Sequence, residues 1–136
     1  DGRAVIGASD AGAHLDLLAT FNYPTRVLAE PVRQHGLLSL EEAVHRMTAV
    51  QADLYGLIDR GRLVEGAHAD VILVDEATVA SDPVTMRPDL PGGAARLYAG
   101  ASGIDDVLVA GVPVVAGGEF TDHRPGRVLR SGTDSR

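Results

Sequence analysis

The sequence lacks cysteine altogether and has few aromatic residues. Without cysteine the chain can form no disulfides, no thiolate metal sites and no cysteine nucleophile. Aromatic residues make up only 4% of the chain, so any core has to be built from Val, Leu, Ile and Ala. The hydrophobic fraction of 45% is ordinary for a globular protein and argues against wholesale disorder.

Positive charge is also scarce. The 12 basic against 19 acidic residues give a net charge of -7, which argues against a nucleic-acid partner because phosphates need basic patches. The chain has no apolar run long enough to span a membrane, and no basic segment followed by an apolar one as in signal peptides. We therefore expect no nucleic acid and no membrane as partner, and a cytoplasmic location.

The length of 136 residues suits about one domain and is small for a complete α/β barrel. The first residue is an aspartate rather than an initiator methionine, and an apolar segment follows almost at once. From these two features we expect a fragment of a longer protein.

That apolar segment leads into small and reactive residues. Residues 4–8 predict a strand buried on both faces, as in a parallel sheet, because apolar residues follow one another without polar alternation. The segment ends at Ser9 and Asp10, and His14 follows four residues later. Chemistry in α/β proteins is placed at such strand ends. Asp10 is therefore the first candidate, as a metal ligand, a general base or a helix cap.

Helical patterns fill the next part of the chain. Pro31 should kink or split the first helix because proline lacks a backbone N–H. Ser39 and Glu42 have the spacing of a capping box at the start of the second helix, and Thr48 can cap the third. The expected helices lie over 24–34, 40–47 and 49–55.

From about residue 57 the pattern changes to short strands and turns. A strand is expected over 69–74, and a hairpin over 107–115 around Ala110-Gly111. Residues 75–103 are rich in Pro, Gly and Asp and have no sustained period, so we expect an excursion with little regular structure. Residues 131–136 are expected to fray. The predicted division is α/β material in 1–57 and β material in 58–136.

Two alternatives remain open at this point. Residues 7–11 resemble the Gly-x-Ser-x-Gly elbow of serine hydrolases with Ala in the last place, and Asp75 and His123 follow Ser9 in the required order. The second alternative is a non-catalytic, β-rich interaction or assembly module with a helical lead-in. No His-x-His or His-Glu-x-x-His motif is present, so the sequence encodes no local metal site.

Beyond these patterns, the order of segments resembles the C-terminal part of the metal-dependent amidohydrolases, in their N-acyl-D-amino-acid deacylase (D-aminoacylase-like) branch. The resemblance covers nearly the whole chain. It rests on Ser9-Asp10-Ala11-Gly12-Ala13-His14, Tyr23-Pro24-Thr25-Arg26-Val27-Leu28, Leu38-Ser39-Leu40-Glu41-Glu42-Ala43-Val44, Met47-Thr48, Leu57-Ile58-Asp59-Arg60-Gly61, Glu65-Gly66-Ala67-His68-Ala69-Asp70-Val71, Val109-Ala110-Gly111 and Arg124-Pro125-Gly126-Arg127-Val128-Leu129-Arg130.

The resemblance implies an α/β plus β fold. In it, 1–57 would supply the last strand and helices of a (β/α)₈ barrel, and 58–136 the C-terminal part of a small β-sandwich built from both chain ends. Asp10 would lie at the end of the eighth barrel strand, contact the zinc site and shuttle a proton from the zinc-bound water to the leaving nitrogen. Ser9 and His14 would lie on the substrate side. The substrate implied is a small N-acyl-D-amino acid.

The chain departs from this family in what it lacks. The His-x-His after the first strand, the bridging ligand and the two mid-barrel histidines have no counterparts here. The segment after Asp10 also lacks the His-Pro-Arg that some relatives carry. Because catalytic zinc takes about three protein ligands, we expect these 136 residues alone to be inactive. The expected partner is the missing N-terminal part of the same enzyme.

Overall fold

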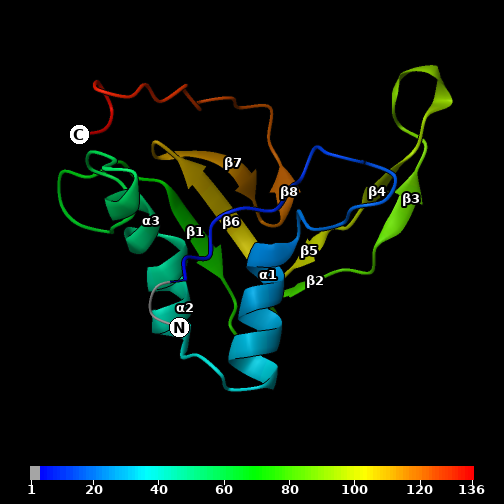
Figure 1. Cartoon of the computed structure of the whole chain (residues 1–136), viewed down its shortest axis with the longest axis horizontal. Coiled ribbons are helices and arrows are strands. Elements are labelled where there is room, and N and C mark those ends of the chain that lie inside the picture. Colours follow the sequence, from blue (N-terminus) through cyan, green and yellow to red (C-terminus); the bar gives the residue numbers. More distant parts are fainter. Residues whose placement is uncertain (1–3) are drawn as a thin grey trace.

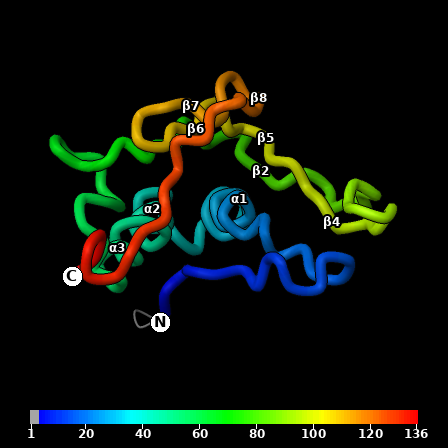
Figure 2. Tube along the Cα trace, turned by 90° about the horizontal axis from the view of Figure 1, so that it is seen from above, coloured from blue at the N-terminus to red at the C-terminus, as the bar shows by residue number. Residues whose placement is uncertain are grey.

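The fold is that of a computed structural model, which describes residues 4–136, so the first three residues of the predicted 1–57 segment lie outside it. Its elements form two layers (Figures 1 and 2). Helices make up one layer, a four-stranded antiparallel sheet the other, and a narrow two-stranded arm projects from one side.

The first helix begins as α1 (Tyr23–Val27) and continues as a π-helix, η1 (Leu28–Gln34). Pro31 lies inside η1 and can donate no backbone hydrogen bond, and the helix widens there instead of splitting. The wider turn brings the His35 N–H to the Glu30 carbonyl, 3.0 Å away. Gly36, at φ +58°, follows the end of the helix.

The second and third helices, α2 (Leu40–Met47) and α3 (Ala49–Leu54), confirm the predicted positions. The Ser39 hydroxyl accepts the Glu42 N–H at 3.1 Å, which is the expected cap. The Glu42 carboxylate does not reach back, because it accepts from Arg46 at 2.6 Å instead. The Thr48 hydroxyl likewise makes no cap; it donates to the Val44 carbonyl one turn earlier.

The four-stranded sheet has the order β1-β6-β7-β8 and is antiparallel throughout. Its strands are β1 (Val71–Val74), β6 (Ile104–Val109), β7 (Val112–Ala116) and β8 (Glu119–Phe120). Ala110 and Gly111, both at positive φ, form the two-residue turn between β6 and β7, as the hairpin pattern predicts. The Asp70 carboxylate, which also pairs with Arg60, accepts the Ala110 N–H at 2.8 Å and holds this turn beside the start of β1.

Residues 75–103 contain more regular structure than predicted. Within this segment, residues 80–102 form an arm of two paired chain segments. In the arm, β2 (Ala80–Ser81) pairs with β5 (Ala101–Ser102), and β3 (Thr85–Arg87) pairs with β4 (Arg96–Tyr98). A single 3₁₀ turn, η2 (Pro91–Gly93), lies at its tip. The sequence hides this arm because strands of two and three residues are too short to show a period of two.

The expected strand over residues 4–8 is not formed. This segment pairs with no strand; the Ile6 carbonyl accepts from the Gln51 side-chain amide instead, and Val5 is 41% exposed. A strand buried in a parallel sheet needs neighbours on both sides. All the described strands of this chain pair antiparallel with one another instead.

The C-terminal residues do not fray. Leu57 forms a β-bridge with Ser135, the Ile58 N–H donates to the Asp134 carbonyl and the Arg136 N–H donates to the Gly56 carbonyl. The expectation for 131–136 was therefore wrong, because it took no account of backbone partners 75 or more residues away.

The core is thin. Val79 is the largest fully buried side chain among the described residues, and the other buried apolar residues are Ala29, Val32, Ala43, Ala49 and Ala52. Large apolar side chains remain exposed along the chain, including Leu54, Leu63, Ile72, Phe120 and Val128. The chain therefore leaves apolar surface of the kind that proteins normally cover.

Candidate functional site

Asp10 lies at the start of a closed loop, residues 9–20. The Thr20 hydroxyl donates to the Ser9 carbonyl at 3.3 Å and joins the two ends of this loop. The Asp10 carbonyl in turn accepts the Ala13 N–H at 3.0 Å, which makes a tight turn immediately after Asp10. This hydrogen bond and this turn fix the backbone on either side of Asp10.

The backbone of Asp10 is strained. Its φ is +30°, a left-handed value that a residue with a side chain rarely adopts. His14 has a φ of +46° in the same loop, and both residues are exposed. Strain of this kind persists only where the surrounding contacts hold it, and it is concentrated at functional sites.

Ser9 and His14, the two predicted substrate-side residues, lie on this loop with different surroundings. The Ser9 hydroxyl accepts the Ala11 N–H at 3.2 Å, so it stabilises the turn that follows it. The His14 carbonyl accepts the N–H groups of Leu17 and Leu18. Across residues 4–136, no hydrogen bond joins the side chains of Ser9, Asp10 and His14 to one another.

The serine-hydrolase alternative finds no support in these contacts. The Asp75 carboxylate accepts from the Ala77 N–H and the Thr78 hydroxyl, and no bond joins it to His123 within the described part of the chain. The His123 Nδ1 lies 3.1 Å from the carbonyl of Pro113 on β7. The order Ser, Asp, His in the sequence therefore does not become a triad.

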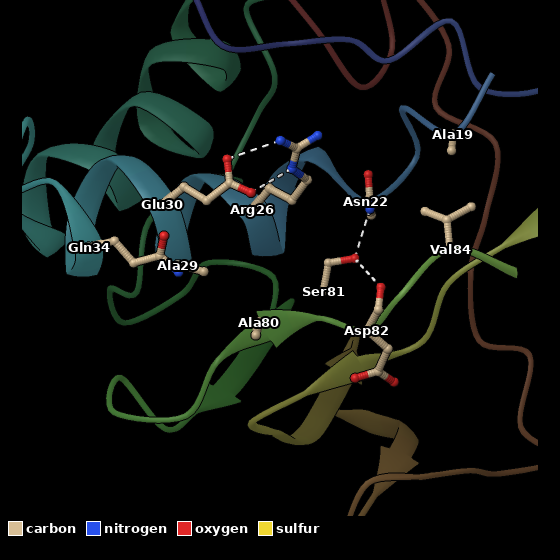
Figure 3. A pocket seen from close by; sticks show the side chains of 10 residues that line it. All are labelled: Ala19, Asn22, Arg26, Ala29, Glu30, Gln34, Ala80, Ser81, Asp82 and Val84. Carbon is tan, nitrogen blue, oxygen red and sulfur yellow. Dashed lines mark hydrogen bonds and ion pairs between the residues drawn. The ribbon is translucent and has the colours of Figure 1, made fainter.

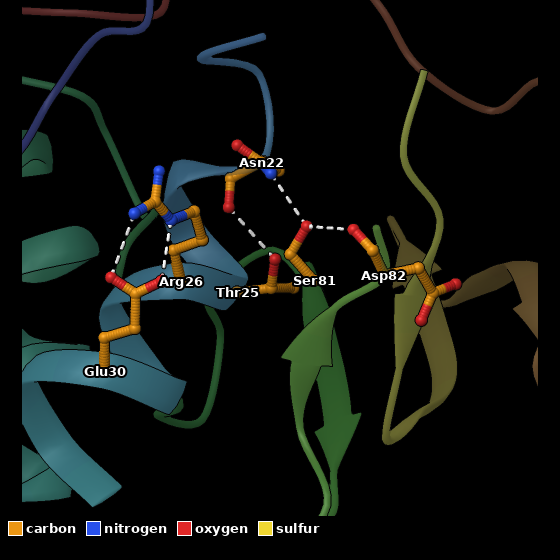
Figure 4. Close-up of polar contacts among 6 residues, drawn as sticks. All are labelled: Asn22, Thr25, Arg26, Glu30, Ser81 and Asp82. Atoms are coloured by element: carbon orange, nitrogen blue, oxygen red, sulfur yellow. Dashed lines mark hydrogen bonds and ion pairs between the residues drawn. The ribbon is translucent and has the colours of Figure 1, made fainter. Parts of the chain in front are cut away.

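Two contacts tie the loop region to the arm. The Leu97 N–H on β4 donates to the Leu15 carbonyl near the loop's tip, at 2.8 Å. Just beyond the loop, the Asn22 amide donates to the Ser81 hydroxyl on β2, at 2.7 Å (Figure 4). Figure 1 shows the loop running from the centre of the molecule out to the arm and back to α1.

A cavity of about 350 Å³ opens beside the base of the loop (Figure 3). Ala19 from the loop, Arg26 and Glu30 from the first helix and Ser81 from the arm are among its lining residues. Arg26 and Glu30 form a two-bonded ion pair at 2.8 and 3.0 Å on its wall. The hydrogen bonds from Arg26 lower the pKa of the Glu30 carboxyl below its usual range.

Sequence reasoning missed this cavity. The spacing of Arg26 and Glu30, four residues apart on a helix, is a signal for their ion pair. Nothing in the sequence points to the contribution of Ser81, which is 59 residues from its partner Asn22.

One polar atom here, Oδ1 of Asn22, is buried without a hydrogen-bond partner in the described structure.

The described residues do not fit a complete zinc site. Within 4–136 there is no group of three or more His, Asp or Glu side chains that could hold a metal ion. Asp10 is a single carboxylate, whereas catalytic zinc takes about three protein ligands. Nor does the described part of the chain contain a helix long and apolar enough to cross a membrane.

Comparison with known proteins decides the family. The model of the family described as "Amidohydrolase family" matches residues 1–115. This chain belongs to the amidohydrolase family. The match includes Asp10, the loop and the arm, and it confirms the resemblance stated from the sequence.

Three similar proteins come from Alcaligenes xylosoxydans xylosoxydans. The N-acyl-D-glutamate deacylase is 43% identical over 90% of this chain, and the N-acyl-D-aspartate deacylase is 41% identical over 79% of it. The D-aminoacylase is 37% identical over 94% of the chain. The chain spans only 22%, 20% and 25% of their respective lengths.

Solved structures that resemble this chain belong to the same kinds of enzyme as its similar sequences. A D-aminoacylase mutant in complex with CuCl₂ superposes with a TM-score of 0.66 and 37% identity, over 81% of this chain and 21% of that one. The N-acyl-D-glutamate deacylase from Bordetella bronchiseptica, complexed with zinc and a phosphonate inhibitor, gives a TM-score of 0.59 and 41% identity, over 79% and 20%. The comparisons thus favour an amidohydrolase over an interaction module or a serine hydrolase.

Proposed function

We propose that this chain is the C-terminal part of a zinc-dependent amidohydrolase that removes the acyl group from N-acyl-D-amino acids, and that Asp10 is its catalytic contribution. The observation that carries the proposal is the position of Asp10. It is a strained, exposed carboxylate at the neck of a closed loop, inside the segment that matches the amidohydrolase family.

The chemistry assigned to Asp10 is proton transfer. Hydrolysis of an amide adds water to the carbonyl carbon and breaks the C–N bond, so one proton must leave the water and one must reach the departing nitrogen. A single carboxylate can accept the first proton and deliver it as the second. Zinc, when bound by the complete protein, would polarise the carbonyl and acidify the water. The described residues do not hold that zinc by themselves.

The division of the chain follows from the same proposal. Residues 1–57 would be the terminal strand and helices of the (β/α)₈ barrel, and residues 58–136 the C-terminal segment of the β-sandwich. The strand expected over 4–8 would form only when neighbouring barrel strands supply its hydrogen-bond partners. The unpaired, partly exposed state of that segment in this chain is consistent with such a requirement.

The proposed partner is the N-terminal part of the same enzyme. The chain covers about a fifth to a quarter of its curated relatives, its core is thin, and large apolar side chains such as Leu54, Ile72 and Phe120 lie exposed. Covering this surface would supply much of the apolar burial that the chain lacks.

The proposed substrates are N-acyl derivatives of D-amino acids, by similarity to the three deacylases. Two of these are deacylases of the acidic N-acyl-D-glutamate and N-acyl-D-aspartate, at 43% and 41% identity, and the third is a D-aminoacylase at 37%.

The proposal is tested first by reading the gene upstream of Asp1. We expect the same frame to encode a His-x-His and two further histidines. The complete product should then release free amino acid from N-acetyl-D-glutamate, N-acetyl-D-aspartate or a neutral N-acetyl-D-amino acid, and the 136-residue chain should not. A start codon directly before Asp1, or zinc-dependent hydrolysis by the chain alone, would contradict the proposal.

A further inference from the structure

The loop that carries Asp10 has few packing contacts of its own. Residues 10–17 are all exposed, and Leu15 and Leu17 show 41% and 72% of their surface. A loop without buried apolar contacts belongs to the least stable part of a structure, so its position depends on a small number of polar contacts. Besides the hydrogen bonds between near neighbours, three hydrogen bonds to residues farther along the chain hold the loop and its exit.

One contact closes the neck, and two lead to the arm. The neck is the Thr20–Ser9 hydrogen bond, next to Asp10. The tip contact joins Leu15 to Leu97 on β4, and the exit contact joins Asn22 to Ser81 on β2. The arm therefore meets the loop region at two points more than ten residues apart along the arm.

The arm is itself built to hold a position. At its root the Ser102 hydroxyl donates to the Asp82 carboxylate at 2.6 Å, and the Arg33 guanidinium on η1 donates to the carbonyls of Glu76 and Val79. Near its tip the guanidinium of Arg87 lies 3.5 Å from the centre of the Tyr98 ring, a cation–π contact. The arm is thus fixed to the helix layer at one end and stiffened at the other.

We propose that the arm, residues 80–102, is a positioning element for Asp10. It holds the 9–20 loop through the Leu97–Leu15 hydrogen bond and the residue just beyond the loop through the Asn22–Ser81 hydrogen bond. This inference rests on the proposed function of Asp10. The arm residues act through the loop and touch no reacting atom. A carboxylate that moves a proton between two substrate atoms must be held within a fraction of an ångström, and a misplacement of about 1 Å can cost about a hundredfold in rate.

The register of β4 offers a sharp test. Because the Leu97 N–H donates outward to Leu15, the Leu97–Met86 pair is one that exchanges no hydrogen bonds with β3. Proline at such an outward-facing edge position removes the contact to the loop and leaves the β3–β4 ladder intact. Leu97→Ala is the matched control, since it loses the same side chain and keeps the N–H.

In the complete enzyme, we expect Leu97→Pro to lower kcat about tenfold or more relative to Leu97→Ala, with KM changed less than about twofold. Hydrogen exchange of the peptide covering residues 9–20, measured on both variants, should be faster in Leu97→Pro. A second pair of variants, Ser81→Ala and Ser102→Ala, tests the same role without introducing a proline that could prevent folding. Ser81→Ala, which breaks the bond to Asn22, should also lower kcat, and Ser102→Ala, which breaks a bond within the arm, should do so less.

Equal kcat values within both pairs, or equal exchange of the 9–20 peptide in the two Leu97 variants, would overturn the positioning role. So would a loss of folded protein with kcat per folded molecule unchanged. If the complete protein hydrolysed no N-acyl amino acid at all, the proposed function would fail instead. The exchange experiment would then still decide whether the arm holds the loop.

Discussion

Gly103 lies so close to Val79 that a Cβ atom on the glycine would stand 2.5 Å from the Val79 backbone nitrogen. Val79 is fully buried, and the two residues meet where the chain leaves the arm and enters β6. The φ of Gly103 is +70°, a conformation that side chains rarely adopt. Space and backbone conformation thus both require glycine here.

Gly103→Ala is therefore expected to lower the free energy of unfolding by more than the strain of a positive φ alone, which costs about 1–3 kcal/mol. Gly92→Ala separates the two causes, because Gly92 has a φ of +72° and open space around its Cβ position. Urea unfolding should show a clearly larger loss for Gly103→Ala. Similar losses would mean that the contact with Val79 relaxes without cost.

The cap of α2 gives a second prediction. Ser39→Ala removes the acceptor of the Glu42 N–H and should lower the free energy of unfolding by about 1 kcal/mol. Ser39→Asp keeps a side-chain acceptor and adds negative charge at the helix N-terminus, so it should unfold at nearly the wild-type urea concentration. An unchanged urea midpoint for Ser39→Ala would show that the cap does not contribute.

Asp75 gives a prediction about pH. The pKa of Asp75 lies below its usual value. The largest cause is the hydrogen bond that its carboxylate accepts from the Thr78 hydroxyl, followed by the one from the Ala77 N–H, and the positive charge of Arg33 also favours the ionised form. A carboxyl whose pKa is lower in the folded state adds stability above its unfolded pKa of about 3.9, and this stability is lost as the pH falls through the folded pKa. Asp75→Asn should therefore be less stable than wild type near neutral pH, with the difference shrinking in acid.

Urea midpoints of wild type and Asp75→Asn at about pH 7 and about pH 2 measure this difference. Asp105→Asn is the control: Asp105 is exposed on β6, and its carboxylate forms no hydrogen bond with another described residue. A gap between Asp75→Asn and wild type that stays the same at both pH values would contradict the lowered pKa.

Local features of the fold were predictable from the sequence. Helix α2 follows from Ser39 and the spacing of its apolar residues, and the β6–β7 hairpin follows from Ala110-Gly111 between two valine-rich segments. These elements are stabilised by contacts between residues a few positions apart, so the local sequence pattern is enough to predict them.

Features that depend on distant partners were not predictable. The arm needs Thr85 to pair with Tyr98, and the C-terminal segment needs Ser135 to pair with Leu57. The apolar pattern of residues 4–8 is the same whether or not these residues form a strand. Strand formation there depends on neighbouring strands, which the pattern does not reveal. At the site, Asp10 and Ser9 stood out by residue type, whereas the contacts of Thr20 and Leu97 with the loop left no local signal.

The central claim is that Asp10 carries the proton in amide hydrolysis, and the kcat of Asp10→Asn in the complete protein tests it most directly. Asp16→Asn is the matched control, since Asp16 is another exposed carboxylate on the same loop. General acid–base groups contribute at least about a hundredfold, so Asp10→Asn should lose at least that much of kcat while Asp16→Asn stays near wild type. A kcat for Asp10→Asn close to wild type, or an equal loss in both variants, would contradict the account.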